Sequence, residues 1–475
     1  MSAAGLTDAA VVDGLRRLGR LPGWLVAGAD GAKVTAALTA AVPEVTEGGW
    51  RIERCDPKLR VKDGPGWAAS YKLGVVDGSG EPRTLQLTGT FNPATASAEP
   101  ATVRGAFGGP GWTAELPALG LSLRAQEEDE GLPALEDLTD AARARVLLES
   151  SLQEAAPGLR IAGVTPEVMR YKPGSRCTVR YRLTYDRPGA GPDVVVAKTY
   201  RGDKGANAYR GMSALDHAGI PPSTVALAPA LAYWPDLKVL VQGAVLEEAT
   251  LKQLAHEAGR TGSDEAFAAL VPEIEKTAAG LAALHASGVD HGELVTWEDE
   301  AGDVRDVLDG LAELAPETVG AADGYLDALT ALAREHPTDP AGPAHRSFRP
   351  AQVLLAGGGI SFIDFDGLCT AEPAIDVALF RAALRDATLR MAPADAVDAR
   401  VAAVDDVCER FLTAYEAAAT ISRARVAVWE GLYLLTFVLH CWTKVRPARI
   451  AGGTALLASH LATMERQFSG PSGGR

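Results

Sequence analysis

The chain has 475 residues, of which 47% are hydrophobic and 6% aromatic, and its formal net charge is −15. This length predicts two to four structural units, and the hydrophobic share is ample for their cores. Because the charge is acidic and no lysine- or arginine-rich cluster interrupts it, nucleic acid and anionic membrane surfaces are poor partners.

Five cysteines are scattered along the sequence, and no two have the spacing of a zinc site or a redox pair. This pattern predicts free thiols in a reducing cytoplasm. The segment 1–20 lacks the apolar core of a signal peptide, and no uninterrupted apolar run approaches the roughly 18 residues of a membrane span. We therefore expect a cytoplasmic protein, and the Ala-, Gly-, Arg- and Asp-rich composition is typical of a bacterial genome rich in GC.

Residues 1–150 predict an N-terminal α+β domain. Helical runs at 9–18 and 32–42 precede a strand-like region from Trp50 to Phe91, in which 50–55 and 83–91 alternate and 68–76 is apolar and β-friendly. Another strand-like piece covers 117–125, and a helix is expected at 137–153. We predict an antiparallel sheet over 45–125.

Residues 151–245 repeat this order. Strands are expected at 165–170, 177–185 and 194–200. Tyr71-Lys72-Leu73 followed by Thr90-Phe91 parallels Tyr181-Arg182-Leu183 followed by Thr199-Tyr200, and this register places Gly89 opposite Lys198 in the comparison. The similarity indicates either an internal duplication or a chance recurrence of a common three-strand pattern.

A stretch from His345 to Gly367 concentrates the polar residues of greatest interest. The segment 352–355 predicts a short strand, 356–359 a turn, and 360–365 the returning strand. This hairpin places Gln352 and Asp364 on the same side. An amide oxygen and a carboxylate there suit a magnesium ion that carries phosphates.

The stretch resembles the catalytic and metal-binding segments of the aminoglycoside phosphotransferase family. The family pattern is His-x-Asp, four residues, Asn or Gln, two apolar residues, and later Ile-Asp-x-Asp. The resemblance implies that His345 occupies the histidine position and that Gln352 and Asp364 hold magnesium. The catalytic aspartate of the family falls on Ser347, so the chain is a divergent member in this respect.

The fold that the resemblance implies is α+β and protein-kinase-like, with a small antiparallel-sheet lobe and a large, mostly helical lobe. The expected ranges are 1–150 for the N-terminal domain, which is a degenerate copy of the small lobe if the duplication is real, 151–245 for the small lobe and hinge, 246–468 for the helical lobe, and 469–475 for a flexible tail. Maltokinases, distant relatives, also carry a domain before their small lobe.

The same resemblance assigns the nucleotide site. Lys198 is expected to hold the α- and β-phosphates of ATP, the preceding glycine turn to cover them, the hinge backbone to meet adenine, and Arg349 to steady the γ-phosphate. The turn residues are Gly174, Ser175 and Arg176, and the hinge residues are Gln242, Gly243 and Ala244.

Other positions carry weaker expectations. The helix at 205–218 has no glutamate to orient Lys198, and its one acid, Asp216, lies late in the helix. Asp376 is expected to cap a helix and to brace the catalytic loop, and His285 to be packed or capping. Asp290, His291 and Glu293 match no common metal-ligand spacing and indicate a solvated loop.

Three functions remain open from the sequence. The first is a pseudokinase that binds ATP and magnesium, because a serine hydroxyl is no general base near neutral pH. The second is a working small-molecule O-phosphotransferase for a sugar or an aminoglycoside, with Asp366 or Glu293 near the acceptor, because phosphoryl transfer depends mostly on positioning and charge neutralisation. The third is a scaffold that binds no nucleotide and contacts a protein partner through its N-terminal domain.

Overall fold

The computed structural model describes residues 14–15, 17–61, 67–125, 131–172, 174–245, 247–312 and 315–468, so the expected tail at 469–475 lies outside them. The chain divides into two compact units. The first contains Met1–Glu128, Glu298–Arg334 and Gly431–Arg475, and the second contains Asp129–Trp297 and Glu335–Glu430. This division differs from the expected ranges, because two segments expected in the helical lobe join the N-terminal region.

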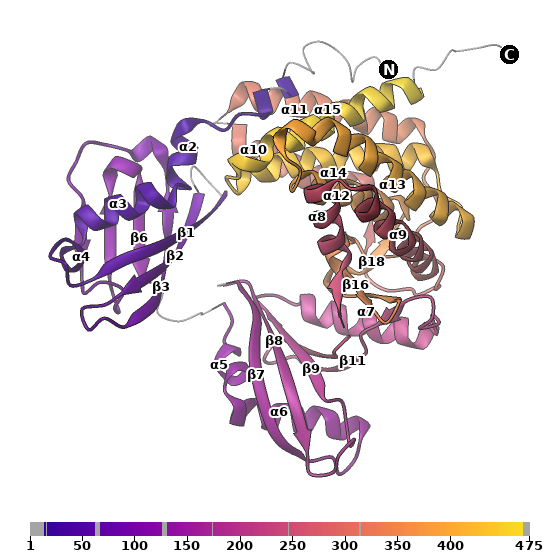
Figure 1. Ribbon diagram of the computed structural model, residues 1–475, viewed down its shortest axis with the longest axis horizontal. Helices are drawn as coiled ribbons and strands as arrows, with labels where there is room; N and C mark the ends of the chain where they lie inside the picture. The colour runs from indigo at the N-terminus through magenta and orange to yellow at the C-terminus, as the bar shows by residue number, and fades with distance from the viewer. Residues whose placement is uncertain are drawn as a thin grey trace. The chain divides into compact units, whose positions relative to one another are not determined.

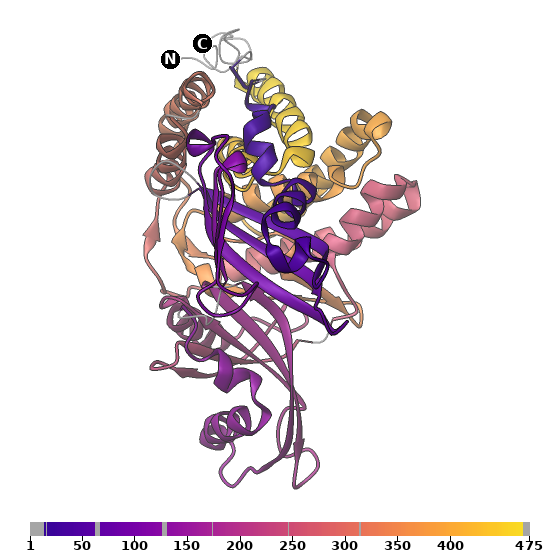
Figure 2. The same ribbon diagram turned by 90° about the vertical axis from the view of Figure 1, so that its left-hand side faces the viewer.

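The first unit contains an antiparallel sheet with the strand order β1-β2-β3-β6-β5-β4, which confirms the sheet expected over 45–125. Alternate residues of β2 are buried, as the period of a strand requires. Helix α3 packs against β1 and β5, and Figures 1 and 2 show it against one face of the sheet. The elements are α2 (Gly23–Gly28), α3 (Gly31–Ala41), α4 (Pro43–Thr46), β1 (Arg51–Val61), β2 (Trp67–Val76), β3 (Pro82–Phe91), β4 (Thr102–Arg104), β5 (Thr113–Leu116) and β6 (Leu121–Ala125).

The rest of the first unit is helical. Trp442 donates a 2.8 Å hydrogen bond to the carbonyl of Leu18, and Arg17 pairs with Glu317 at 2.5 Å, so segments that are distant in sequence meet within this unit. The helices are α10 (Trp297–Ala312), α11 (Pro316–Glu335), α15 (Pro447–Phe468) and the part of α14 (Arg423–Thr443) from Gly431 onward. Among the described residues, α14 alone is long and apolar enough to cross a membrane, and 83% of its apolar window is buried inside the protein, as in a core helix.

The second unit begins with the small lobe. Its five-stranded antiparallel sheet has the order β11-β12-β9-β8-β7. One face of this sheet is buried against α5 and α6 around Cys177, Val179 and Tyr181 (Figure 1). The elements are α5 (Leu135–Thr139), α6 (Ala141–Ala155), β7 (Ile161–Lys172), β8 (Arg176–Tyr185), β9 (Val194–Tyr200), α7 (Lys204–Ala218), β11 (Ala230–Trp234) and β12 (Val239–Gly243).

The large lobe of the second unit is mostly helical. The expected hairpin is present as β16 and β17, which pair antiparallel across Gly357 and Gly358. The long elements are α8 (Leu251–Thr261), α9 (Asp264–His285), α12 (Ala374–Leu389) and α13 (Val397–Ala418). The short ones are β10 (Ala226–Leu227), β13 (Ala249–Thr250), β14 (Leu294–Val295), β15 (Gly342–Ala344), η4 (Pro350–Gln352), β16 (Val353–Ala356), β17 (Gly359–Phe362), η5 (Phe365–Gly367) and β18 (Cys369–Ala371).

The two large sheets correspond in more than one respect. Five neighbouring strands of the N-terminal sheet lie side by side in the order β1-β2-β3-β6-β5. The strands of the small-lobe sheet lie in the order β7-β8-β9-β12-β11, so the chain passes through both sheets in the same way. Helix α6 begins 110 residues after α3, and β7 begins 110 residues after β1. These matches support the predicted duplication.

Two hydrogen-bonded contacts also recur. The Asp30 carboxylate caps α3 by accepting from the second and third backbone N–H groups of the helix, and Asp140 caps α6 in the same way. The buried Tyr71 hydroxyl donates to the carbonyl of Gly28 at 2.8 Å, and that of Tyr181 donates to the carbonyl of Leu138 at 2.7 Å. In both cases 43 residues separate the partners.

The sequence comparison matched Gly89 with Lys198, and the strand pairing shows that this match is wrong. Tyr71 pairs with Leu87, three residues before Thr90, whereas Tyr181 pairs with Val195, three residues before Lys198. Thr90 therefore takes the lysine position. Position 89 requires glycine because a Cβ atom there would lie 1.8 Å from the carbonyl oxygen of Ser122 on β6.

Candidate functional site

The candidate site lies within the second unit, where the catalytic loop precedes the β16–β17 hairpin. His345 is fully buried, and its backbone N–H donates to Asp376 Oδ2 at 2.5 Å. Its ring contacts the carbonyl of Ile363 through Nε2 at 3.0 Å. The histidine thereby joins the catalytic loop to the residue directly before Asp364.

Ser347 is the residue that the sequence resemblance matches to the catalytic aspartate of the family. Its Oγ lies 3.2 Å from His345 Nδ1. The side chain is half-buried. Arg349 is exposed, and its extended backbone forms the N-cap of η4.

The two expected magnesium ligands lie at the two ends of the β16–β17 hairpin: Gln352 ends η4 directly before β16, and Asp364 follows β17. The backbone N–H of Ile363 donates to the carbonyl of Gln352 at 3.1 Å, so the two ends are adjacent. Asp364 has a positive φ of 74°, a strained value for a residue other than glycine. The Oε1 atom of Gln352 is buried, and no hydrogen-bond partner is found for it within the described part of the chain. Because buried amide oxygens normally have a partner, this atom fits a cation ligand. Gln352 and Asp364 are also the hard oxygen donors that magnesium prefers.

Two cations face two carboxylates above this loop. Lys198 Nζ lies 3.0 Å from Asp364 Oδ1 and 3.8 Å from Asp366 Oδ1. Arg176 Nη1 lies 3.6 Å from Asp366 Oδ2 and 4.0 Å from Asp364 Oδ2. The structure therefore brings the expected phosphate-binding residues to the expected metal ligand.

The pKa values of the two carboxyl groups are shifted in opposite directions. Burial disfavours ionisation of Asp364, but Lys198 and Arg176 outweigh it and hold the pKa of this carboxyl well below its ordinary value. Burial raises the pKa of Asp366, and the Asp364 carboxylate adds to the rise against the attraction of Lys198. Asp364 is thus the member that is ionised at neutral pH, which suits the metal ligand expected there.

Tyr200 holds the second carboxylate, a contact that the sequence analysis missed. Its hydroxyl donates to Asp366 Oδ1 at 2.7 Å. Burial, followed by the charge of Asp366, raises the pKa of Tyr200 well above its ordinary value, so the hydroxyl keeps its proton. Tyr200 lies two residues after Lys198 on β9, and the period of a strand places both side chains on one face. That spacing was the available signal.

Helix α7 reaches the metal loop without a carboxylate. Asn207 Nδ2 donates to the carbonyl of Leu368 at 3.0 Å, and His291 Nε2 contacts Asn207 Oδ1, also at 3.0 Å. Asp216 is exposed, and no ion pair between Lys198 and an acid of α7 occurs among the described residues. His291, expected in a solvated loop, therefore supports the asparagine that attaches α7 to the metal loop.

The glycine turn and the hinge lie at the ends of small-lobe strands. Gly174 has φ of 66°, and the turn is closed by a 3.1 Å hydrogen bond from Ser175 N–H to the carbonyl of Lys172. In the hinge, Gln242 is buried and the N–H of Gly243 donates to the carbonyl of Pro229 at 2.9 Å. Ala244 follows the end of β12 and is half-buried.

Asp376 braces the catalytic loop but does not cap a helix. It is the third residue of α12, whose N-cap is Pro373, so the helix begins earlier than expected. Besides the His345 backbone, its Oδ2 contacts His285 Nε2 at 3.1 Å, and His285 Nδ1 contacts the Tyr415 hydroxyl at 2.7 Å. His285 is therefore a packed structural residue, as expected.

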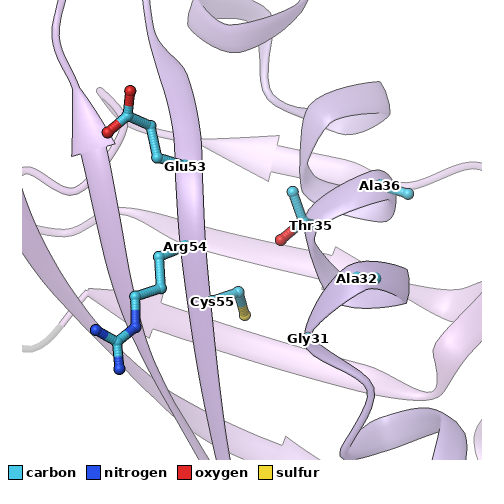
Figure 3. A pocket seen from close by; sticks show the side chains of 7 residues that line it. All are labelled: Gly31, Ala32, Thr35, Ala36, Glu53, Arg54 and Cys55. Carbon is cyan, nitrogen blue, oxygen red and sulfur yellow. The ribbon is translucent and has the colours of Figure 1, made fainter.

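A separate hollow of about 580 Å³ lies between α3 and β1 in the first unit. Figure 3 shows Thr35 and Cys55 facing each other across it, whereas Glu53 and Arg54 extend away from α3. Burial raises the pKa of the Cys55 thiol to about 11, so it is a poor nucleophile at neutral pH. Among the described residues, no group of three His, Cys, Asp or Glu side chains is arranged to hold a metal ion.

Comparison with known proteins covers the large-lobe part of this site and leaves Arg176 and Lys198 outside the matched residues. Residues 212–426 match the model of a phosphotransferase enzyme family. The matched segment begins within α7 and includes both the catalytic loop and the metal loop. Together with the sheet-bearing small lobe and the helical large lobe, this match shows the α+β, kinase-like fold that the sequence predicts.

Several solved structures are similar at low sequence identity, whereas no curated protein matches the chain. A glucosamine kinase in complex with glucosamine, ADP and inorganic phosphate is 15% identical, with a TM-score of 0.45 over 92% of this chain and 98% of that one. A choline/ethanolamine kinase family protein from Mesorhizobium loti is 15% identical, with a TM-score of 0.42 over 67% and 98%. An apo thermostable aminoglycoside phosphotransferase mutant is 15% identical, with a TM-score of 0.39 over 68% and 100%.

Proposed function

We propose that the second unit binds ATP with magnesium and is a pseudokinase, degenerate in phosphoryl transfer to a separate acceptor. The observation that supports this proposal most directly is the buried, unpartnered Oε1 of Gln352 beside a loop that carries the ionised Asp364. A bound magnesium ion would satisfy the amide oxygen and would neutralise phosphate charge.

The cations of the small lobe supply the phosphate side of the proposed site. Lys198 is only 9% exposed and extends from β9, whereas Arg176 extends from the start of β8. A triphosphate carries several negative charges, so these two side chains can exchange their carboxylate partners for phosphate oxygens. Nucleotide binding therefore requires no residue that this chain lacks.

Transfer to a separate acceptor is the degenerate part. A general base takes the proton of the attacking hydroxyl and typically contributes about 10²–10⁴ in rate. Ser347 has no carboxylate to do so, and Lys198 has no carboxylate partner from α7. The proposed site therefore keeps the binding groups and lacks the acceptor-side base.

A second candidate is an active small-molecule O-phosphotransferase acting on a sugar or an aminoglycoside. The phosphotransferase family match supports it, as does Asp366, a buried carboxylate whose raised pKa suits a proton acceptor. Its hydrogen bond with Tyr200 already occupies one oxygen, so we favour the first proposal.

A thermal-shift titration tests nucleotide binding directly. The wild-type protein should gain stability with ATP, more so with magnesium, because a ligand that binds only the folded state stabilises it by mass action. Lys198→Ala should weaken the ATP shift, and Lys204→Ala, an exposed lysine at the start of α7, should not. If ATP with magnesium leaves the wild-type melting temperature unchanged, the protein is instead the scaffold considered above.

A further inference from the structure

The structure contains a serine–histidine pair at the centre of the candidate site. Ser347 Oγ and His345 Nδ1 are 3.2 Å apart, within the range of a nucleophile and its general base. The base is oriented in turn by a third group, because His345 Nε2 contacts the carbonyl oxygen of Ile363 at 3.0 Å. A nucleophile, a base and an orienting group thus lie in sequence.

The partners of the histidine determine its tautomer. A carbonyl oxygen only accepts hydrogen bonds, so Nε2 must carry the proton in the contact with Ile363. In the neutral ring Nδ1 is then an acceptor, and the Ser347 hydroxyl donates to it. This is the arrangement in which an imidazole withdraws a proton from a hydroxyl that attacks an electrophile.

The position of Ser347 directs this pair at the metal loop. A Cβ atom at Gly367 would lie 3.9 Å from Ser347 Oγ and 3.4 Å from the carbonyl oxygen of His345, so the two loops are in close approach. Ser347 is half-buried, whereas His345 is fully buried. The serine hydroxyl is therefore the more accessible end of the pair, beside the loop that carries Asp364.

We propose that Ser347 is a site of self-phosphorylation by a bound nucleoside triphosphate, with His345 as the general base. The inference rests on the proposed ATP binding. Ser347 Oγ forms a bond to the γ-phosphorus while the bond from that phosphorus to the β–γ bridging oxygen breaks. The hydroxyl proton moves to His345 Nδ1, the nucleoside diphosphate leaves with the electron pair of the broken bond, and phosphoserine remains.

This reaction differs from that of a phosphotransferase with a separate acceptor. The acceptor hydroxyl is part of the chain, so each molecule accepts one phosphoryl group and turnover stops. The product carries a charge of about −1.5 to −2 at neutral pH, in the loop where the resembling family has a carboxylate. Self-phosphorylation would thereby place negative charge in a loop where this chain has a neutral serine hydroxyl.

Intact-protein mass spectrometry tests the inference. The wild-type protein incubated with ATP and magnesium should gain the mass of one phosphoryl group, and peptide mapping should place it on Ser347. ADP should give no gain. Ser347→Ala and Asp364→Ala should lose the modification, whereas Ser213→Ala, a serine on α7 that bonds its own helix, should keep it.

The thermal shift with ATP separates the two proposals. A wild-type protein that binds ATP but carries no phosphate on Ser347 overturns self-phosphorylation and leaves nucleotide binding intact. An undiminished mass gain in Ser347→Ala places the modification elsewhere and also overturns it. A wild-type protein without any ATP shift overturns both proposals.

Discussion

Lys198 Nζ donates a 3.0 Å hydrogen bond to Asp364 Oδ1, although the two residues lie 166 positions apart in the chain. The lysine expected to hold phosphates and the carboxylate expected to hold magnesium are thus partners of each other. A nucleotide with its metal offers each of them the opposite charge. Under the proposed function, binding in this site takes place by exchange of an existing ion pair.

Asp364→Ala should remove the part of the ATP thermal shift that depends on magnesium, because Asp364 supplies the ionised oxygen ligand of the loop. The comparison is between thermal shifts with ATP alone and with ATP plus magnesium. Asp216→Ala, which removes an exposed acid on α7, serves as the control. A magnesium-dependent shift of wild-type size in Asp364→Ala contradicts the assignment.

Ser347→Asp should not create transfer to a separate acceptor, because Lys198 still lacks a carboxylate partner from α7. The affinity for ATP should change little, since residue 347 serves the acceptor side of the γ-phosphate. ATP consumption with candidate sugars and aminoglycosides measures the first effect, and thermal shift measures the second. A gain in turnover approaching the roughly 10²–10⁴ of a positioned base would instead favour the second candidate function.

Asp366→Asn should stabilise the folded protein relative to wild type, and this stabilisation should grow as the pH rises. The pKa of Asp366 is raised in the folded protein, so its stabilising contribution is fully present below its ordinary value of 3.8 and is lost as pH rises through the raised pKa. Asparagine removes this loss. The melting temperature of the variant relative to wild type should therefore increase as the pH rises from about 4 through the raised pKa of Asp366.

Asp364→Asn is the matched comparison, with a different pH profile. The pKa of Asp364 is lowered, so its contribution is fully present above 3.8 and disappears only as pH falls through the lowered pKa. This variant should melt below wild type by a constant amount over the same pH range. If the melting temperatures of the two variants relative to wild type change with pH in the same way, the pKa values of Asp364 and Asp366 are not shifted in opposite directions.

Asp30→Ala and Asp140→Ala should destabilise their helices by similar amounts, about 0.5–2 kcal/mol each, because each removes an N-cap that accepts two backbone hydrogen bonds. Hydrogen exchange measured on the amides of α3 and α6 reports the local loss. Glu99→Ala, in an exposed segment between β3 and β4, is the control. Protection that falls in only one of the two helices argues against equivalent caps.

Local patterns predicted most elements of the fold. The apolar run around Tyr71 and the alternation around Tyr181 identified strands, and the small residues at 356–359 identified the turn of the hairpin. The family pattern predicted Gln352 and Asp364 as a pair, and they lie at the two adjacent ends of the β16–β17 hairpin. These features are local, because each depends on spacing within a few residues.

The errors arose where long-range contacts decide the structure. A one-residue difference in register moved the lysine position from Gly89 to Thr90, and strand pairing fixes that register. The tertiary fold also set the start of α12, so Asp376 lies inside the helix. Asn207 and His291 meet across 84 residues, and no local pattern predicts that contact.

The shared strand order of the two sheets has a consequence for folding on the ribosome. Strands of similar path in one chain can pair with the wrong copy, a recognised failure of repeated architectures. About 75 residues separate the end of β6 from the end of β9. At a synthesis rate of about 5–20 residues per second, the N-terminal sheet has roughly 4–15 s to pair its strands before β9, the third strand of its counterpart, is complete. The order of synthesis therefore gives the N-terminal sheet time to pair its own strands before the strands of the small-lobe sheet can compete for them.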